Sequence, residues 1–250
     1  MLRLEGKSAL VIGSATGIGR AVCLAFAAEG ATVLAADHGL RDDKRTLLEA
    51  ISSAGGRALA CDCDVTKEAD VRGAVEAAVA EFGRLDIMVN NAGIGLPMRS
   101  FVECDWEDWQ RVFDVNLVGV AWGMKHALPY MLAQGYGRIV NTASQLAHKP
   151  APGAAAYSAS KAAVVALTTA VAMEVAERGV VVNSVCPGPT DTHTWRASDP
   201  DWRAWKASQL PIRRVGEPRE IAPAYVYLAS DEASYMIGQS ISPNGGDVSW

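Results

Sequence analysis

Short, continuous runs of apolar residues alternate along this chain with longer stretches in which apolar positions recur every three or four residues. The short runs predict strands, and the longer stretches predict amphipathic helices. Because the strands are apolar at nearly every position rather than at alternate ones, we expect both of their faces to be buried. Seven strands are predicted, at residues 8–13, 31–37, 58–61, 86–93, 138–144, 179–188 and 238–246.

Helices are predicted between these strands, at residues 17–29, 42–54, 67–82, 105–133 and 155–178. Alternation of strands and helices gives a parallel sheet with right-handed crossovers and helices on both faces. The sequence has no internal repeat and no linker rich in proline or glycine. We therefore predict the α/β class, as a single doubly wound Rossmann-type domain over residues 1–250 with about seven parallel strands.

Composition and charge narrow the range of partners. Half of the 250 residues are hydrophobic, the net charge is −5 and the pI is near 5.4. An acidic chain without a basic run argues against binding to nucleic acid or to anionic membranes. The longest uncharged stretch in the second half, residues 162–173, is too short to span a bilayer.

The cysteines and the first residues bear on the compartment. The five cysteines are scattered, and Cys61 and Cys63 are too close together for a CxxC pair, so we expect free thiols. Residues 1–13 do not have the layout of a signal peptide, because Glu5 and Lys7 interrupt any apolar core. We expect a cytoplasmic protein that uses no metal.

A glycine-rich turn, GSATGIG at residues 13–19, lies between the first strand and the first helix. Gly13 permits the tight turn, while Gly17 and Gly19 let a phosphate approach the N–H groups of the helix. Asp37 ends the second strand, where a carboxylate can accept hydrogen bonds from an adenosine ribose. This carboxylate would repel the 2′-phosphate of NADP, so the pattern favours NAD. The other interpretation of Asp37 is an N-cap for the next helix.

Tyr157 and Lys161 are four positions apart in the alanine-rich segment AYSASKAA, so one helix face presents both side chains. A free tyrosine, with a pKa of about 10, is a poor base at neutral pH. An ammonium ~4 Å away in a partly wet site would lower that pKa by ~2–3 units. The pair therefore indicates proton transfer to or from an alcohol oxygen.

Further motifs occur in a fixed order: DV at 64–65, NNAG at 90–93, Asn116 in VNLVG, Ser144 in NTAS, YSASK at 157–161 and PGPTDT at 187–192. With these motifs and the glycine turn, the chain resembles the compact, single-domain branch of the short-chain dehydrogenase/reductase family over essentially its whole length. One departure is Ile12, where the family usually has threonine. We expect this change to remove a side-chain hydrogen bond near NNAG, with a small structural effect.

The resemblance implies catalytic roles for four residues. Tyr157 is the general acid/base, Ser144 hydrogen-bonds the substrate oxygen, Lys161 also binds the nicotinamide ribose, and Asn116 supports a water-linked proton relay. It further implies a homotetramer, with contacts through residues 105–133 and 155–178 and through the C-terminal segment that ends at Trp250. The implied cofactor site comprises Gly13, Thr16, Gly17, Ile18, Gly19, Asp37, Asp64, Val65, Asn91, Ala92, Gly93, Tyr157, Lys161, Pro187, Gly188, Thr190 and Thr192.

Residues 189–211 follow the sixth strand, where substrates bind in such sheets. A long connection at this place is typical of a substrate lid. Trp202 and Trp205 are three positions apart and predict a short amphipathic helix, although each tryptophan could equally pack on the body or on another subunit. The residues expected to contact the substrate are Gly95, Leu96, Gln145, Leu146 and Trp195.

These features predict an NAD(H)-dependent oxidoreductase that interconverts a secondary alcohol and a ketone. An NADP(H)-dependent ketoreductase is the alternative within the same chemistry. Reduction of a C=C bond is disfavoured, because the enoyl reductases of this family space Tyr and Lys by seven positions rather than four. A non-catalytic NAD-binding regulator is the alternative of another class, but such proteins usually lose Tyr, Lys or Ser, and all three are present here.

Overall fold

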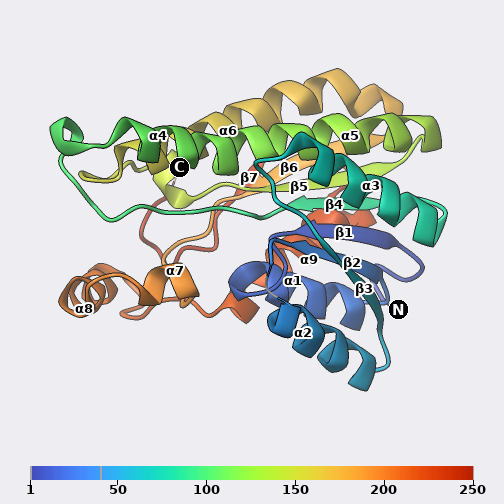
Figure 1. Ribbon diagram of the computed structural model, residues 1–250, viewed down its shortest axis with the longest axis horizontal. Helices are drawn as coiled ribbons and strands as arrows, with labels where there is room; N and C mark the ends of the chain where they lie inside the picture. Colours follow the sequence, from blue (N-terminus) through green and yellow to red (C-terminus); the bar gives the residue numbers. More distant parts are fainter. Residues whose placement is uncertain (1, 40, 250) are drawn as a thin grey trace.

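The protein is described by a computed structural model that covers residues 2–39 and 41–249. Its centre is a sheet of seven parallel strands in the order β3-β2-β1-β4-β5-β6-β7 (Figure 1). This confirms the predicted doubly wound arrangement, although the last strand is only two residues long. The strands are β1 (Ser8–Ile12), β2 (Thr32–Asp37), β3 (Arg57–Asp62), β4 (Ile87–Asn90), β5 (Gly137–Thr142), β6 (Val180–Val185) and β7 (Ser240–Ile241).

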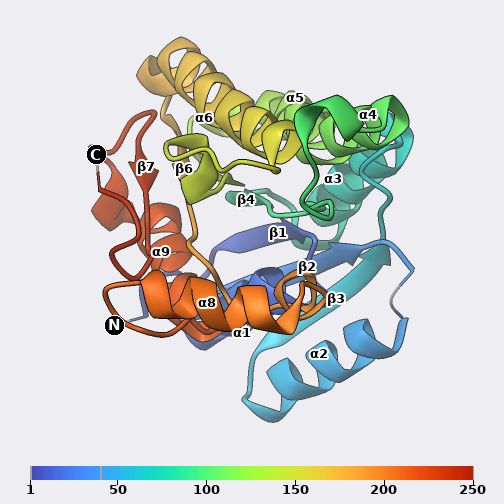
Figure 2. The same cartoon turned by 90° about the vertical axis from the view of Figure 1, so that its left-hand side faces the viewer.

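Helices cover both faces of the sheet, as Figures 1 and 2 show. The helices are α1 (Gly17–Ala28), α2 (Arg41–Ser53), α3 (Glu68–Phe82), α4 (Trp106–Phe113), α5 (Gly119–Gln134), α6 (Ala155–Val175), α7 (His193–Arg196), α8 (Pro200–Gln209) and α9 (Pro218–Ala229). The layer with α1, α2 and α9 lies below the sheet in Figure 1, and α3, α4, α5 and α6 lie above it. The helices α7 and α8 project from one end of the body.

Successive residues of each central strand enter two different cores. In β1, Leu10 and Ile12 pack into the core under α3, α5 and α6, while Ala9 and Val11 pack into the core under α1 and α9. All five residues of β1 are buried. Alternation of side chains between the two faces therefore explains why these strands are apolar at every position.

The predicted long helix over residues 105–133 is present as one continuous helical segment, but it is not regular. Within it, a π-helical stretch, Asp114–Val118, joins α4 to α5. Asn116 lies in this stretch and is completely buried, and its amide accepts from Ile94 N (2.8 Å) and donates to Ile94 O (3.0 Å). The wider turn leaves the helix continuous while Asn116 stays bonded to the loop after β4, and hydrophobic periodicity alone does not reveal such a change.

The longest helix of the fold packs along one side of the sheet. By length and composition the segment Ala155–Arg178 could cross a membrane, with a mean hydropathy of 1.4 over its most apolar window. In the fold it packs against β6 and α4, and it buries Ser158, Ser160 and Lys161 inside the protein. A third of that window is buried, so these contacts cover part of its apolar surface. Trp250, which the sequence analysis assigns to a subunit contact, lies outside the described residues.

Candidate active site

The strand order reverses between β1 and β4, and the chain segments that leave the carboxyl ends of β1, β4, β5 and β6 meet there. Ligands of open α/β sheets bind in the crevice at such a switch point. The glycine turn, the NNAG loop, Ser144 and the PGPTDT segment each follow one of these strands directly. The fold thus brings four of the motifs to one end of the sheet.

The glycine turn is packed tightly onto the NNAG loop. A Cβ atom on Gly13, whose φ is 83°, would lie 2.4 Å from Ala92 N, and one on Gly19 would lie 1.9 Å from Gly13 O. Asn91 donates from Nδ2 to Gly13 O at 2.7 Å. The carbonyl of Ile12 accepts from the backbone N–H groups of Asn91 and Ala92 at 2.9 and 3.0 Å. Main-chain bonds therefore maintain the link to this loop although Ile12 has replaced the usual threonine.

The N-terminus of α1 is open to an anion. Its N-cap, Thr16, has an extended backbone and makes no side-chain capping hydrogen bond, so the first N–H groups of the helix have no side-chain acceptor there. Gly17 has a φ of 54°, and a Cβ at this position would lie 3.2 Å from a methyl carbon of Thr192. Free N–H groups and the helix dipole favour a phosphate here.

Asp37 closes the other side of the glycine turn. Its carboxylate accepts from Ala15 N at 2.7 Å and from His38 N at 2.8 Å. The nearby ammonium of Lys44 is buried, donates to Asp37 O at 3.2 Å and pairs with the Asp62 carboxylate. Asp37 is therefore a fixed negative charge beside the turn, and Lys44 is directed to other acceptors.

The DV motif lies just beyond the end of β3. The Asp64 carboxylate accepts from Thr66 N at 3.0 Å and from Thr66 Oγ1 at 2.7 Å. The hydroxyl of Thr66 in particular holds the pKa of this carboxyl below its ordinary value, so Asp64 is ionised at neutral pH. Val65 packs against Gly119, where a Cβ would lie 2.9 Å from the valine Cβ.

Ser144, Tyr157 and Lys161 meet behind this crevice. Ser144 follows β5, is 6% exposed, and its hydroxyl is near enough to the Tyr157 phenol to act against the rise in the pKa of that phenol. Lys161, one turn further along α6, is 2% exposed, and its ammonium lies 5.8 Å from the centre of the Tyr157 ring. The ammonium donates to Thr142 O at 2.8 Å. The structure therefore brings the three predicted residues together.

The pKa shifts differ from the sequence expectation. Burial raises the pKa of Tyr157, and the hydrogen bond from Ser144 only partly opposes this effect. Burial also lowers the pKa of Lys161 to about 8. The expected lowering of the tyrosine pKa by the ammonium is therefore not found, because desolvation dominates in a site drier than the sequence analysis assumed.

Asn116 connects the π-helical stretch to the same centre. A Cβ on Gly93 would lie 3.3 Å from both Asn116 Oδ1 and Lys161 Nζ, so these three predicted residues are neighbours. The sequence analysis missed Ser160, which accepts from Asn116 Nδ2 at 3.1 Å and donates to Tyr157 O at 2.8 Å. A polar residue beside Lys161 on a buried helix is the signal that could have identified it.

The PGPTDT segment is held against the C-terminal loop. Gly188 donates from its backbone to Pro243 O at 3.0 Å, and a Cβ on Gly188 would lie 2.5 Å from Asn244 Cα. Thr190 donates from its hydroxyl to Gly188 O at 2.9 Å, which closes the turn. Gln145 N donates to Pro187 O at 3.0 Å. These bonds place the segment next to Ser144, as the motif order implies.

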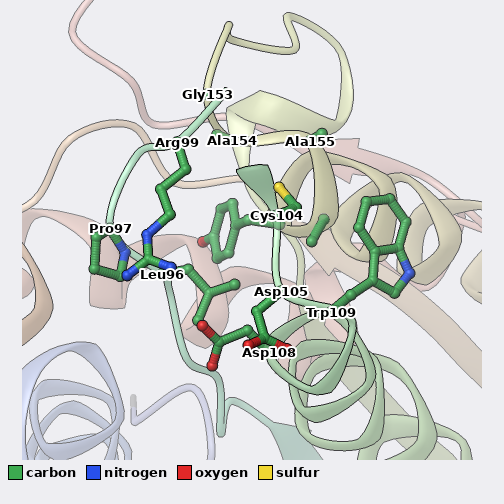
Figure 3. Close-up of a pocket in the computed structure, with 12 residues that line it drawn as sticks. Leu96, Pro97, Arg99, Cys104, Asp105, Asp108, Trp109, Gly153, Ala154 and Ala155 are labelled. Carbon is green, nitrogen blue, oxygen red and sulfur yellow. The ribbon is translucent and has the colours of Figure 1, made fainter. Parts of the chain in front are cut away.

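A pocket opens beside Tyr157 (Figure 3). Leu96 is the one residue among those expected to contact the substrate that lines it; Trp109, Cys104 and Arg99, which the sequence analysis missed, line it as well. Its lining comprises Leu96, Pro97, Arg99, Cys104, Asp105, Asp108, Trp109, Gly153, Ala154, Ala155, Ala156 and Tyr157.

The other residues expected at the substrate lie outside this pocket. Gly95 faces Thr194, 3.4 Å from where a Cβ would stand, and Leu146 N donates to Ser144 Oγ. Gln145 is 3% exposed and donates to the Asp247 carboxylate at 2.5 Å. Trp195 contacts Trp202, with ring centres 5.4 Å apart. Gln145 and Trp195 therefore connect the site to the segments around it.

The predicted lid contains α7 and α8. Asp199 caps α8 by accepting from Trp202 N at 2.8 Å, and Trp205 is 57% exposed on the same helix. Lys206 pairs with the Asp247 carboxylate at 2.6 Å, and that carboxylate is 5% exposed. The lid is thus attached to the C-terminal loop through one well-covered ion pair.

Comparisons with known proteins match this chain over nearly its whole length. A family model described as enoyl-(acyl carrier protein) reductase matches residues 13–247. The chain is 39% identical over 247 residues to the 3-oxoacyl-[acyl-carrier-protein] reductase of Thermotoga maritima, covering 99% of this chain and 100% of that protein. It is 41% identical over 240 residues to the cis-4-hydroxycyclohexanecarboxylate dehydrogenase of Sinomonas cyclohexanicum, covering 96% of each.

Among solved structures, a short-chain type dehydrogenase/reductase from Mycobacterium marinum superposes with a TM-score of 0.92 at 39% identity, covering 98% of this chain and 96% of that one. The fold and the site define an oxidoreductase that binds a nicotinamide dinucleotide. The chain belongs to the short-chain dehydrogenase/reductase family.

Proposed function

We propose that this protein is an NAD(H)-dependent oxidoreductase that interconverts a secondary alcohol and a ketone, with Tyr157 as general acid/base. The observation that supports this function best is that the Ser144 hydroxyl, the Tyr157 phenol and the Lys161 ammonium come together, with the ammonium 5.8 Å from the centre of the phenol ring. One oxygen of a substrate can contact both hydroxyl groups at once. A bound nicotinamide supplies or accepts the hydride.

Each residue has a distinct task in this proposal. During oxidation, Tyr157 accepts the alcohol proton; during reduction, it donates that proton to the carbonyl oxygen. Ser144 donates a hydrogen bond to the same oxygen and stabilises charge that develops there. Lys161 would bind the nicotinamide ribose. Asn116, bonded to Ser160 and the Ile94 backbone, supports the water-linked relay that resupplies the proton.

The residues present fit a dinucleotide. The uncapped N-terminus of α1 offers N–H groups to the phosphates, and Asp37 offers a carboxylate to the adenosine ribose. The carboxylate favours NAD over NADP, because a 2′-phosphate would lie against a negative charge whose own partners are two backbone N–H groups. NADP(H) is the alternative cofactor.

Carbonyl reduction is favoured over reduction of a C=C bond, although the matching family model carries the name of an enoyl reductase. Tyr157 and Lys161 are separated by four positions and share one face of α6. Ser144 also argues against a non-catalytic NAD-binding regulator, since cofactor binding alone does not require its hydroxyl beside the Tyr157 phenol. As one relative is named for a ring alcohol, cyclic alcohols are suitable first compounds to test.

Assembly and compartment are part of the proposal. We expect a homotetramer in the cytoplasm that acts on a small alcohol or ketone and binds neither nucleic acid nor membrane. Light scattering at micromolar concentration tests the assembly, and a stable monomer would contradict it.

The function is tested by following absorbance at 340 nm with purified protein, each cofactor, and a panel of secondary alcohols and ketones. We expect turnover with NAD(H) on at least one pair. Binding of NADH without turnover of any alcohol or ketone would favour the regulator instead.

A further inference from the structure

The pocket beside Tyr157 contains a cation without a partner. Figure 3 shows the Arg99 side chain extending across the pocket, with its guanidinium next to Leu96 and Pro97. Among residues 2–39 and 41–249, no side chain or main-chain acceptor is bonded to this guanidinium, and no carboxylate pairs with it. Arg99 is exposed, so water solvates its guanidinium in the free protein, and a substrate anion in the pocket would replace that water.

The two carboxylates of the same pocket already have partners. Asp105 caps α4 and accepts from Glu107 N at 2.8 Å. Asp108 accepts from Arg111 at 2.7 Å, in an ion pair three positions apart on α4. Arg99 is therefore the charged side chain of the pocket that is available to a ligand.

The place of Arg99 relative to the reaction centre is set by the backbone. Arg99 N donates to Gly153 O at 3.0 Å, and a Cβ on Gly153 would lie 3.4 Å from that same nitrogen. Gly153 is four positions before Tyr157 and belongs to the loop that leads into α6. The loop that holds the backbone of Arg99 thus leads directly into the first turn of α6, which carries the Tyr157 phenol.

We propose that Arg99 binds a carboxylate of the substrate, so that the enzyme acts on hydroxy acids and the corresponding oxo acids. This inference rests on the proposed function, because it places the alcohol of the same molecule at Tyr157. Guanidinium and carboxylate form paired, charge-assisted hydrogen bonds. The walls around them are largely apolar, with Leu96, Pro97, Trp109 and Ala155, which suits the apolar part of such a substrate.

The experiment compares each acid with its own methyl ester. Cyclic and open-chain hydroxy acids and their esters are assayed with NAD, so that the alcohol is unchanged and only the charge differs. For wild type we expect kcat/KM to be at least ~10-fold higher for the preferred acid than for its ester, mainly through KM, since hydrogen bonds to charged groups contribute about this much. The preference should weaken at high salt.

Variants separate charge from structure. Arg99→Met should lose at least ~10-fold on the acid and leave the ester unchanged, and Arg99→Lys should recover part of the loss. Arg178→Met is the matched control: Arg178 is also exposed, lies outside the pocket and has no hydrogen-bond or ion-pair partner for its side chain among the described residues. It should leave the ratio of acid to ester unchanged.

The outcomes distinguish this inference from the proposed function. Equal turnover of acids and esters by wild type, or an equal loss on both in Arg99→Met, would overturn the role of Arg99 and leave the alcohol chemistry standing. Absence of turnover on every alcohol and ketone would instead contradict the proposed function. In that case, calorimetry of the acids with the NADH-loaded protein still tests Arg99, and binding that is unchanged in Arg99→Met would overturn the inference.

Discussion

The ammonium of Lys161 donates a 2.8 Å hydrogen bond to the main-chain oxygen of Thr142, at the end of β5. The hydroxyl of the same Thr142 donates to Asn91 Oδ1 at 3.1 Å and shares a 2.7 Å bond with Tyr225. The Lys161 ammonium is thus held by the main chain at the end of β5. Because the ammonium is buried, keeping it charged costs free energy. The first two predictions follow from this arrangement of Lys161 and Tyr157.

Tyr157→Phe should abolish almost all turnover and leave NADH affinity intact, because the ring remains and only its proton chemistry is lost. Stopped-flow turnover and fluorescence titration with NADH check the two parts. A variant that keeps a tenth of wild-type kcat has lost only about 1.4 kcal/mol of transition-state stabilisation. Such a result would rule out Tyr157 as the essential acid/base.

Lys161→Met should be inactive but more stable than wild type at neutral pH. The folded-state pKa is about 8, against 10.5 for the exposed group, so between these values the folded state binds fewer protons than the unfolded one. The free energy of unfolding of wild type therefore rises with pH across that window. Below pH 8 the full penalty remains, about 3 kcal/mol, partly offset by the bond to Thr142.

Denaturant melts of wild type and Lys161→Met at pH 7 and pH 10 check this stability prediction. We expect the variant's advantage to be clear at pH 7 and much smaller at pH 10. A variant that is destabilised by the same amount at both pH values would show that burial of the ammonium does not limit stability.

Cofactor choice should depend on Asp37. Wild type is expected to prefer NAD strongly over NADP in kcat/KM. The double variant Asp37→Ser/His38→Arg removes the repelling carboxylate and adds a phosphate partner, so its preference should move toward NADP. The single variant His38→Arg is the control, and it should keep most of the NAD preference. Equal use of both cofactors by wild type would contradict the role of Asp37.

The lid, residues 189–211, should exchange its amide hydrogens faster than β5 and tighten when cofactor and substrate bind, because it offers little continuous apolar surface. Lys206→Met removes its ion pair with Asp247 and should speed exchange in α8 and raise KM, with little change in NADH affinity. Lys149→Met is the matched control. It loses a bond to the same carboxylate (3.2 Å) but lies outside the lid. Lid amides as protected as those of β5 would identify the segment as a fixed element.

Trp195→Ala offers an independent test of the same segment. Its ring lies 5.4 Å from that of Trp202, so the substitution removes an aromatic contact between α7 and α8. We expect a higher KM or a changed substrate preference with NADH affinity retained. Unchanged kinetics would mean that these tryptophans serve only packing.

The sequence predicted those parts of the fold and site that depend on local pattern. The apolar run 8–13 predicted a central strand, and β1 occupies it with all five of its residues buried. The spacing of Tyr157 and Lys161 predicted one shared helix face, and both side chains reach the same centre. Such features follow from periodicity and spacing along a single element.

Features that depend on tertiary contacts were not predictable in this way. The proposed role of Arg99 depends on Asp105 and Asp108 being bonded to other groups, Glu107 N and Arg111. The spacing of these residues in the sequence does not show which groups they bond. The ion pair between Lys206 and Asp247 joins positions that are 41 residues apart in the sequence. The raised pKa of Tyr157 depends on how much water the fold excludes, which composition does not give.

The π-helical stretch Asp114–Val118 also bears on how the length of this protein can vary. Its wide turn takes up one residue more than a regular turn, so deleting one residue there would restore a regular helix and keep α5 in register. Val120, Met124 and Ala127 would stay buried in the core, while Asn116 would lose the place that bonds it to Ile94. A one-residue gap at this stretch, when related chains are aligned, would therefore mark a chain that lacks the wide turn.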